Sequence, residues 1–261
     1  MSISYFDAHS HLNFPDYGAD LPDILSRMKE ENIWTITVGT DLESSRRAVE
    51  LAEKEGGIFA SVGIHPVDDR EARFVEEEFE KLAAHPKTVA IGECGLDYYR
   101  VDTGDGSEKS RQKKLFTQQI EFALKHGKPL MIHARDAYDE LIEILTAYKR
   151  QNPNLKGNTH FFSGNLLQAK KLVDLEFTLS FAGPITFSSD YNEVIRSVPL
   201  SSILSETDSP FVAPVPHRAK RNEPSYVKEI VKTIIFLRSE EEEKVKEVLV
   251  QNVLRLFKIH D

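Results

Sequence analysis

The chain has 261 residues, 40% hydrophobic and 29% charged, which suits one globular domain with a sizeable core. Its net charge of −9 argues against a basic protein that coats nucleic acid, and its single cysteine, Cys94, excludes a disulfide framework or a four-thiolate zinc site. No stretch approaches the ~20 consecutive apolar residues of a membrane span, and the first residues lack a secretory pattern. We therefore expect a cytoplasmic protein without a membrane partner.

Short apolar runs alternate with amphipathic stretches along the chain. The stretches place apolar residues at helical spacing, as at Leu21, Ile24 and Met28. Regular alternation of strand and helix predicts a parallel sheet with right-handed crossovers. Eight such units fit a closed TIM-type (β/α)₈ barrel, spanning 1–261 as one domain, better than the alternative of an open doubly wound sheet. The predicted strands are Ser4–His9, Ile33–Val38, Ile58–Val62, Thr88–Ile91, Leu130–Ile132, Gly157–His160, Phe177–Ser180 and Ile203–Ser205.

A Pro-rich loop, 210–224, follows the eighth predicted strand. Two further helical patterns come after it, one through Ile230 and Ile234 and the other through Val245 and Leu249. We expect these extra C-terminal helices to close the outer ring of the barrel.

Residues of metal-ligand type gather at the ends of the predicted strands. In the first strand, alternation puts His9 and His11 on the same side, and Asp7 shares their parity, so it is a candidate acceptor for a histidine N–H. Catalytic groups of TIM barrels collect at the C-terminal ends of the strands. Histidines placed by chance would instead be spread over strand starts, helices and loops. The other candidates at or just after strand ends are Glu93, His133, His160 and Asp208.

Four imidazoles and two carboxylates without a thiolate predict a site for two divalent cations of the zinc, manganese or magnesium type. Two cations carry +4 and the two carboxylates −2, so an anionic phosphate would be attracted to the site. Arg135, Arg218 and Arg221 are candidates for contacts to phosphate oxygens, and a solvated loop surface is the alternative for such cations.

These motifs closely resemble the TatD family of metal-dependent deoxyribonucleases, within the amidohydrolase-like barrels. The resemblance implies a TIM barrel in which His9, His11, Glu93 and Asp208 hold one cation, while Glu93, His133 and His160 hold the other. It also implies that His65 lies near the substrate phosphate, with a turn-capping histidine as the alternative. The matching blocks are Phe6-Asp7-Ala8-His9-Ser10-His11-Leu12, Gly63-Ile64-His65-Pro66, Gly92-Glu93-Cys94-Gly95-Leu96-Asp97-Tyr98-Tyr99, Ile132-His133-Ala134-Arg135-Asp136-Ala137, His160-Phe161-Phe162-Ser163-Gly164, Glu206-Thr207-Asp208-Ser209-Pro210 and Arg218-Ala219-Lys220-Arg221-Asn222-Glu223-Pro224.

The first functional hypothesis is a nuclease that hydrolyses DNA phosphodiesters, with a metal-held hydroxide as nucleophile, Glu93 and Asp208 as catalytic carboxylates, and Asp208 as acceptor of the proton. The resemblance favours 3′–5′ exonuclease action, although the sequence leaves endonuclease action open. A second hypothesis keeps the site but changes the bond to another ester, phosphoester, lactone or amide. A third is a non-catalytic nucleic-acid-binding protein. A glycosidase pair formed by the two carboxylates leaves the four histidines without a role. The metal and the oligomeric state stay open.

Overall fold

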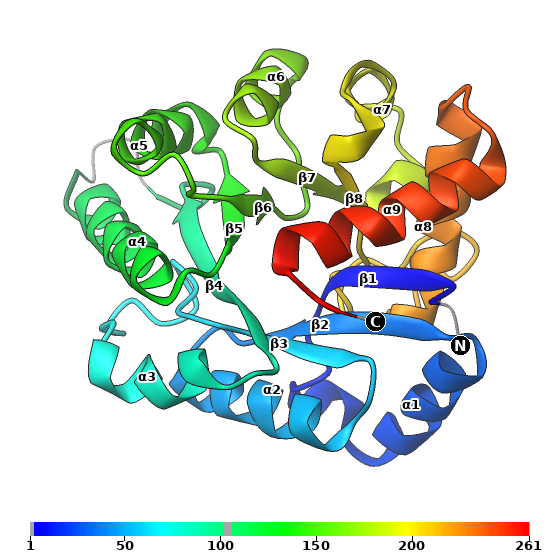
Figure 1. Ribbon diagram of the computed structural model, residues 1–261, viewed down its shortest axis with the longest axis horizontal. Coiled ribbons are helices and arrows are strands. Elements are labelled where there is room, and N and C mark those ends of the chain that lie inside the picture. The colour runs from blue at the N-terminus through cyan, green and yellow to red at the C-terminus, as the bar shows by residue number, and fades with distance from the viewer. Residues whose placement is uncertain (1–2, 102–105, 261) are drawn as a thin grey trace.

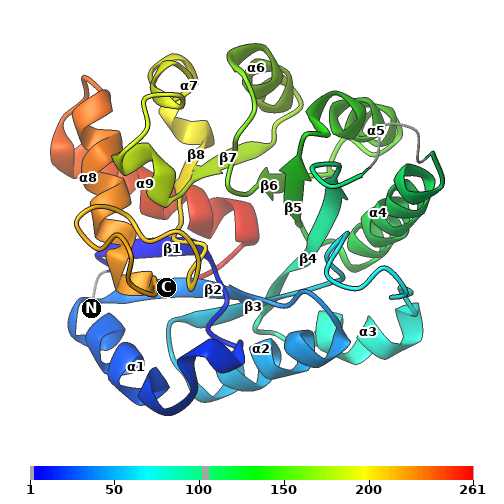
Figure 2. The same ribbon diagram turned by 180° about the vertical axis from the view of Figure 1, so that it is seen from behind.

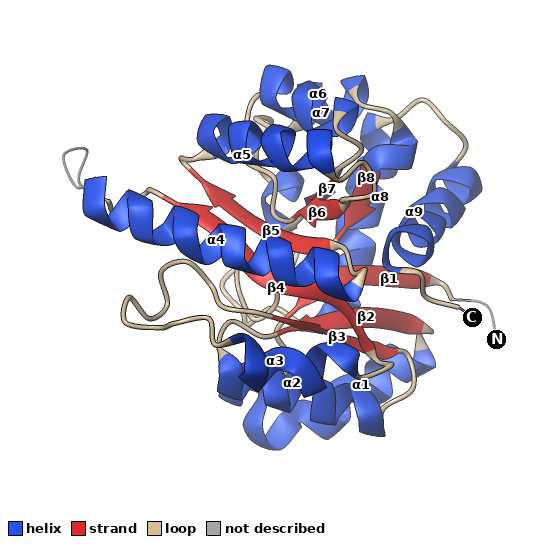
Figure 3. Cartoon of the chain, turned by 60° about the vertical axis from the view of Figure 1, so that its left-hand side comes forward, coloured by secondary structure: helices blue, strands red, loops and turns tan. Residues whose placement is uncertain are grey.

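The computed structural model describes residues 3–101 and 106–260, and its centre is one sheet of eight parallel strands (Figure 1). Each strand pairs with the next one along the chain, and helices surround the sheet (Figure 3). This is the TIM-type barrel that the alternating pattern predicts. The strands are β1 (Tyr5–Ser10), β2 (Ile33–Val38), β3 (Ile58–Val62), β4 (Thr88–Asp97), β5 (Leu130–Arg135), β6 (Gly157–Thr159), β7 (Thr178–Phe181) and β8 (Ile203–Ser205).

Nine α-helices lie within the described ranges, most of them in the connections between successive strands. Two begin with a reciprocal cap: the Asp41 carboxylate accepts the Ser44 N–H at the start of α2, and Asn165 does the same for Gln168 in α6. No helix in this part of the chain is long and apolar enough to cross a membrane. The helices are α1 (Leu21–Glu30), α2 (Leu42–Lys54), α3 (Glu76–Ala84), α4 (Gly106–His126), α5 (Tyr138–Gln151), α6 (Leu166–Asp174), α7 (Asn192–Ser197), α8 (Val227–Leu237) and α9 (Glu242–Phe257).

The predicted strands hold with one substantial exception. The bounds of β2, β3 and β8 are as predicted, β1 and β7 are each shifted by one residue at both ends, and β6 ends one residue earlier. The strand β4 was predicted to stop at Ile91, but it continues to Asp97, and β5 continues to Arg135. The register between β4 and β5 shifts between Ile91 and Cys94. Glu93 therefore lies within an irregular strand rather than at a strand end.

The barrel closes where the chain leaves β8 and passes beside β1. The Asp208 N–H donates to the His9 carbonyl oxygen at 2.9 Å, and the His11 N–H donates to the Ser209 carbonyl oxygen at 2.7 Å. An isolated parallel bridge between Ser10 and Ser209 lies between these bonds. The C-terminal ends of the first and last strands are thereby held against each other.

The two helices after β8 are present as predicted, but the last one does not complete the outer ring. A buried cluster joins Phe6, Ile36 and Leu204, from three strands, to Val253 and Phe257 of α9. The helix α9 thus packs against β1 and β8 and covers the N-terminal end of the barrel (Figure 1). The view from behind shows the loop between β8 and α8 at the opposite end (Figure 2).

Candidate metal centre

The structure brings the six predicted ligands together at the C-terminal ends of the strands. Five of them line a cavity of about 970 Å³, and His9 lies fully buried beneath it. Their positions in the fold are His9 in β1, His11 just after β1, Glu93 in β4, His133 in β5, His160 just after β6, and Asp208 just after β8.

The first group of donor atoms consists of two histidine nitrogens and two carboxylate oxygens. The Nε2 atoms of His9 and His11 lie 3.1 Å apart. Asp208 Oδ1 lies 3.6 Å from His9 Nε2 and 3.4 Å from His11 Nε2, and Glu93 Oε2 lies 3.5 and 3.6 Å from the same two atoms. Ligands bound tetrahedrally at 2.0–2.2 Å are about 3.3–3.6 Å apart, so the four distances between imidazole nitrogens and carboxylate oxygens match the spacing of one coordination shell.

The second group forms around the other oxygen of Glu93. Glu93 Oε1 lies 3.0 Å from His133 Nδ1 and 2.8 Å from His160 Nε2, and these two nitrogens are 3.3 Å apart. His65 Nε2 lies 3.5 Å from the same oxygen. Glu93 thus presents one oxygen to each group.

The charges of these side chains fit divalent cations. Burial alone would raise the pKa of Glu93, but the charges of His160 and His65, together with a hydrogen bond to His133, hold it well below its usual range. Burial lowers the pKa of His160, yet Glu93 and Glu206 hold it well above its usual value. The carboxylates therefore create a field that favours positive charge among the imidazoles, and cations would satisfy that field in place of protons.

Two of the ligand rings are fixed by contacts on their far side. His11 Nδ1 lies 2.8 Å from the Val38 carbonyl oxygen, and His133 Nε2 lies 3.0 Å from Asp97 Oδ2. A histidine that donates its second N–H in this way keeps its other nitrogen free and aimed at a metal.

The predicted phosphate contacts divide into two pairs. His65 and Arg135 line the cavity, where the Arg135 guanidinium lies 3.6 Å above the Tyr99 ring. Among the described residues, Arg218 and Arg221 are not part of that lining. Arg218 stacks on Phe187, while Arg221 pairs with Asp20 and stacks on Tyr17. The geometry offers no support for a phosphate contact by either of the latter two.

The comparisons identify the family. A family model described as TatD related DNase matches residues 6–258. This chain belongs to the TatD-related DNase family. YabD of Bacillus subtilis (strain 168), described as an uncharacterized metal-dependent hydrolase, is 39% identical over 98% of this chain and 99% of its own length. TatD of Mycobacterium tuberculosis, described in the same words, is 32% identical over 96% of this chain and 97% of its own.

Among solved structures, YJJV, a TatD homologue from Escherichia coli K12, matches with a TM-score of 0.91 and 28% identity over 100% of both chains. The likeness extends over the whole barrel and not only over its motifs. This chain is therefore a metal-dependent hydrolase of the TatD family with a TIM-barrel fold.

The expectation that Asp7 accepts a histidine ring N–H is wrong. Its carboxylate accepts the backbone N–H of His9 at 3.3 Å and both the N–H and the hydroxyl of Thr207, at 2.7 and 2.6 Å. Asp7 therefore ties β1 to the segment after β8, and it binds no imidazole.

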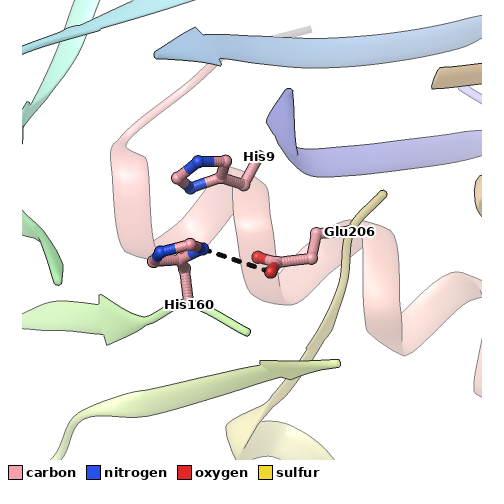
Figure 4. A group of neighbouring side chains, drawn as sticks. All are labelled: His9, His160 and Glu206. Atoms are coloured by element: carbon pink, nitrogen blue, oxygen red, sulfur yellow. Dashed lines mark ion pairs between the residues drawn. The ribbon is translucent and has the colours of Figure 1, made fainter. Parts of the chain in front are cut away.

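Two carboxylates that contact TatD-family ligand positions were missed. Asp97 accepts from His133, and the fully buried Glu206 lies 3.4 Å from His160 Nδ1 (Figure 4). Asp97 shares the parity of Glu93 along β4, so a predicted strand that reached Asp97 would have put both side chains on the same face. Glu206 directly follows β8, two residues before Asp208, and its parity gave the same kind of signal.

Proposed function

We propose that this TatD-family hydrolase is a deoxyribonuclease that uses two divalent cations to hydrolyse DNA phosphodiester bonds, acting as a 3′–5′ exonuclease. The observation that carries the proposal is the position of Glu93, whose two oxygens face two separate groups of histidines. Two-metal nucleases and phosphatases hold their cations about 4 Å apart, and a shared carboxylate achieves this spacing.

We assign one cation to His9, His11, Asp208 and Glu93, and the other to Glu93, His133 and His160. The distances within each group support this division. Imidazole and carboxylate donors suit zinc and manganese and also accommodate magnesium, so the donor set leaves the identity of the cation open.

Cations bound here would acidify a water molecule and neutralise charge on the attacking and leaving oxygens. We assign Asp208 as the acceptor of the proton of that water, because its side chain lines the cavity and is 14% exposed. Burial raises its pKa, but a hydrogen bond to His11 and the charges of His9 and His160 bring it below its usual value. The carboxylate is therefore ionised at neutral pH, as both a metal ligand and a proton acceptor must be. His65 and Arg135 would donate to phosphate oxygens.

The charge balance of the centre changes the reason for expecting a phosphate. The sequence suggested an excess of +2, but the neighbouring Asp97 and Glu206 add two further formal negative charges and cancel it. The attraction for an anion must therefore come from the wall of the cavity. Three arginines line it there: Arg70, Arg100 and Arg135.

The same cavity supports a nucleic-acid substrate. Its lining combines three arginines with five aromatic side chains. Aromatic rings stack on bases regardless of sequence, while guanidinium groups bind the phosphates. When the end of a DNA strand enters such a cavity, both its bases and its phosphates can be bound. The aromatic residues are Phe14, Tyr99, Phe161, Tyr191 and Phe211.

The test is cleavage of end-labelled single- and double-stranded DNA in Mg²⁺ or Mn²⁺, together with metal analysis of the purified protein. Asp208→Asn is expected to lower kcat by about 100-fold or more, because it removes the proton acceptor and one ligand. Asp174→Asn, on the exposed end of α6, makes the same chemical change far from the cavity and is expected to keep wild-type activity.

Shortening of the DNA from its 3′ end by wild-type protein supports the proposal. Equal activity of wild type and Asp208→Asn contradicts the role of Asp208. Turnover of a lactone, amide or phosphotriester without turnover of DNA indicates that the same metal centre hydrolyses another kind of bond. Tight DNA binding without turnover in saturating metal makes the chain a binding protein.

A further inference from the structure

The side of the centre that faces away from the cavity contains two ring nitrogens without a hydrogen-bond partner. The rings of His9 and His160 are stacked, with centroids 3.9 Å apart and planes 14° from parallel. Within the described residues, the Nδ1 atoms of both rings are buried and make no hydrogen bond. Each of these histidines belongs to a different one of the two donor groups described above.

The side chain of Glu206 lies beside both rings (Figure 4). Its Oε1 lies 3.4 Å from His160 Nδ1, without the alignment of a hydrogen bond, and accepts the Phe161 N–H at 2.7 Å. Its Oε2 accepts the Ser180 hydroxyl at 2.5 Å. One ligand-type atom from each of His9, His160 and Glu206 lies within 4.8 Å of the others. In the described part of the chain, both groups that hydrogen-bond to this carboxylate donate to it, so Glu206 acts as an acceptor.

A third cation among these three residues is chemically unfavourable. When the Nε2 atom of a neutral imidazole binds a cation, the remaining ring proton is on Nδ1. A further cation at the Nδ1 atoms would require both rings to lose that proton. Two buried Nδ1–H groups near one buried carboxylate need no such loss, so protons suit this cluster better than a cation does.

We propose that Glu206 is a positioning residue that accepts the Nδ1 protons of His9 and His160 and thereby orients one ligand of each cation. His160 Nδ1 lies 3.4 Å from Glu206 Oε1, and one ring nitrogen of His9 lies within 4.8 Å of the same cluster. The inference rests on the two-cation ligand set proposed above, and it is independent of which bond is hydrolysed. Because one carboxylate supports both groups, it couples the binding of the two cations.

Two other carboxylates near the centre provide matched comparisons. Asp97 contacts the ring of His133 only, so its loss is expected to weaken one cation site. Asp7 is as deeply buried as Glu206 but accepts only from the backbone of His9 and from Thr207. Replacing Asp7 therefore reports the cost of altering a buried carboxylate without altering an imidazole contact.

The experiment measures Mn²⁺ binding to metal-free protein by calorimetry. In Glu206→Gln the amide oxygen can still accept from Phe161, and the Ser180 hydroxyl can turn to accept from the new NH₂ group, so the side chain retains its place. We expect both Mn²⁺ sites to weaken by about 10- to 100-fold in Glu206→Gln, the range typical of residues that support metal ligands. Asp97→Asn is expected to weaken one site. Asp7→Asn, which alters the junction of β1 with the segment after β8 but no imidazole contact, is expected to weaken either site less than Glu206→Gln does.

A spectroscopic measurement on the wild-type protein needs no variant to fold. In ¹⁵N-histidine spectra of the zinc-loaded protein, His9 and His160 are expected to carry their protons on Nδ1 and to exchange them slowly with solvent.

Glu206→Asp, which keeps the charge, is expected to recover part of the Mn²⁺ affinity lost in Glu206→Gln.

The outcomes separate this inference from the proposed function. Wild-type protein that binds only one cation overturns the two-cation ligand set and this inference with it. Wild-type protein that binds two, with unchanged affinities in Glu206→Gln or with His9 and His160 unprotonated at Nδ1, overturns the role of Glu206 alone. Equal weakening in Asp7→Asn and Glu206→Gln also overturns it, because that result reports a general effect of buried carboxylates.

Discussion

Replacing Gly95 by alanine is expected to destabilise the barrel and displace the proposed metal ligand His133 in one step. Gly95 lies in β4 opposite His133 of β5 and has a φ of 144°, where residues with side chains are rarely found. A Cβ atom there would lie 2.0 Å from the His133 carbonyl oxygen, whereas ordinary contact begins at 3.4 Å. The two strands would therefore have to separate by about 1.4 Å, the difference between these distances, and His133 would move with β5.

The expected cost follows from two contributions. The unfavourable backbone conformation costs about 1–3 kcal/mol, and the weakening of one or two ladder hydrogen bonds costs about 1 kcal/mol each. A total of about 3 kcal/mol corresponds to a fall in Tm of roughly 6–12 °C for a domain of this size. The assay is thermal unfolding of the metal-free protein followed by circular dichroism, with Mn²⁺ affinity measured by calorimetry on the same samples.

Two glycines elsewhere separate the contributions. Gly127 has a φ of 62°, but an added Cβ would have no atom within 4 Å, so Gly127→Ala contains the backbone cost alone. Gly56 has neither a positive φ nor a close neighbour, so Gly56→Ala is expected to leave Tm unchanged. Only Gly95→Ala should lose Mn²⁺ affinity. If Gly95→Ala melts within about 2 °C of Gly127→Ala and binds Mn²⁺ like wild type, the reasoning from the close strand contact is refuted.

Two further predictions concern the cations and the substrate. Saturating the protein with Mn²⁺ at ~100 times its Kd is expected to stabilise it by about 2.7 kcal/mol per site, and EDTA should reverse the rise in Tm. A Tm that changes with neither Mn²⁺ nor EDTA contradicts the metal centre. Arg135→Ala is expected to raise KM for DNA about tenfold or more with little change in kcat, since a charge-assisted hydrogen bond is worth about 1.5–3 kcal/mol. Arg221→Ala, which removes a guanidinium paired with Asp20 outside the cavity lining, serves as its control, and equal KM changes would argue against the assignment.

The barrel was predictable because its strands are buried on both faces and therefore appear as short apolar runs. This holds for β2, β3 and β8, whose bounds match the prediction. The prediction of the strand bounds failed for β4, where Gly92 and Glu93 interrupt the apolar run and resemble the start of a loop. Both are buried in the structure, because the charged residue faces the metal centre instead of solvent. A functional residue thus concealed the continuation of its own strand.

That the six candidate ligands lie close together was predictable because the C-terminal ends of the strands meet in any TIM barrel. The supporting contacts were not. Asp7 has the parity expected of a histidine partner, yet Thr207 occupies its oxygens. Glu206 meets His160 from a strand two positions around the sheet, which depends on the register of β6, β7 and β8. Parity along the chain indicates the side to which Glu206 points, but it does not identify the ring that Glu206 meets.

The hydrogen bonds that close the barrel are also the ones that assemble its centre. Asp208 donates its N–H to the carbonyl oxygen of His9, and His11 donates its own to Ser209, so ligands from opposite ends of the chain become neighbours only when β1 and β8 meet. Asp7 strengthens the same junction through Thr207. Cation binding by His9, His11 and Asp208 would then favour the closed barrel directly, because the open chain does not hold these donors together. The metal centre and the last step of barrel closure are therefore expected to form together.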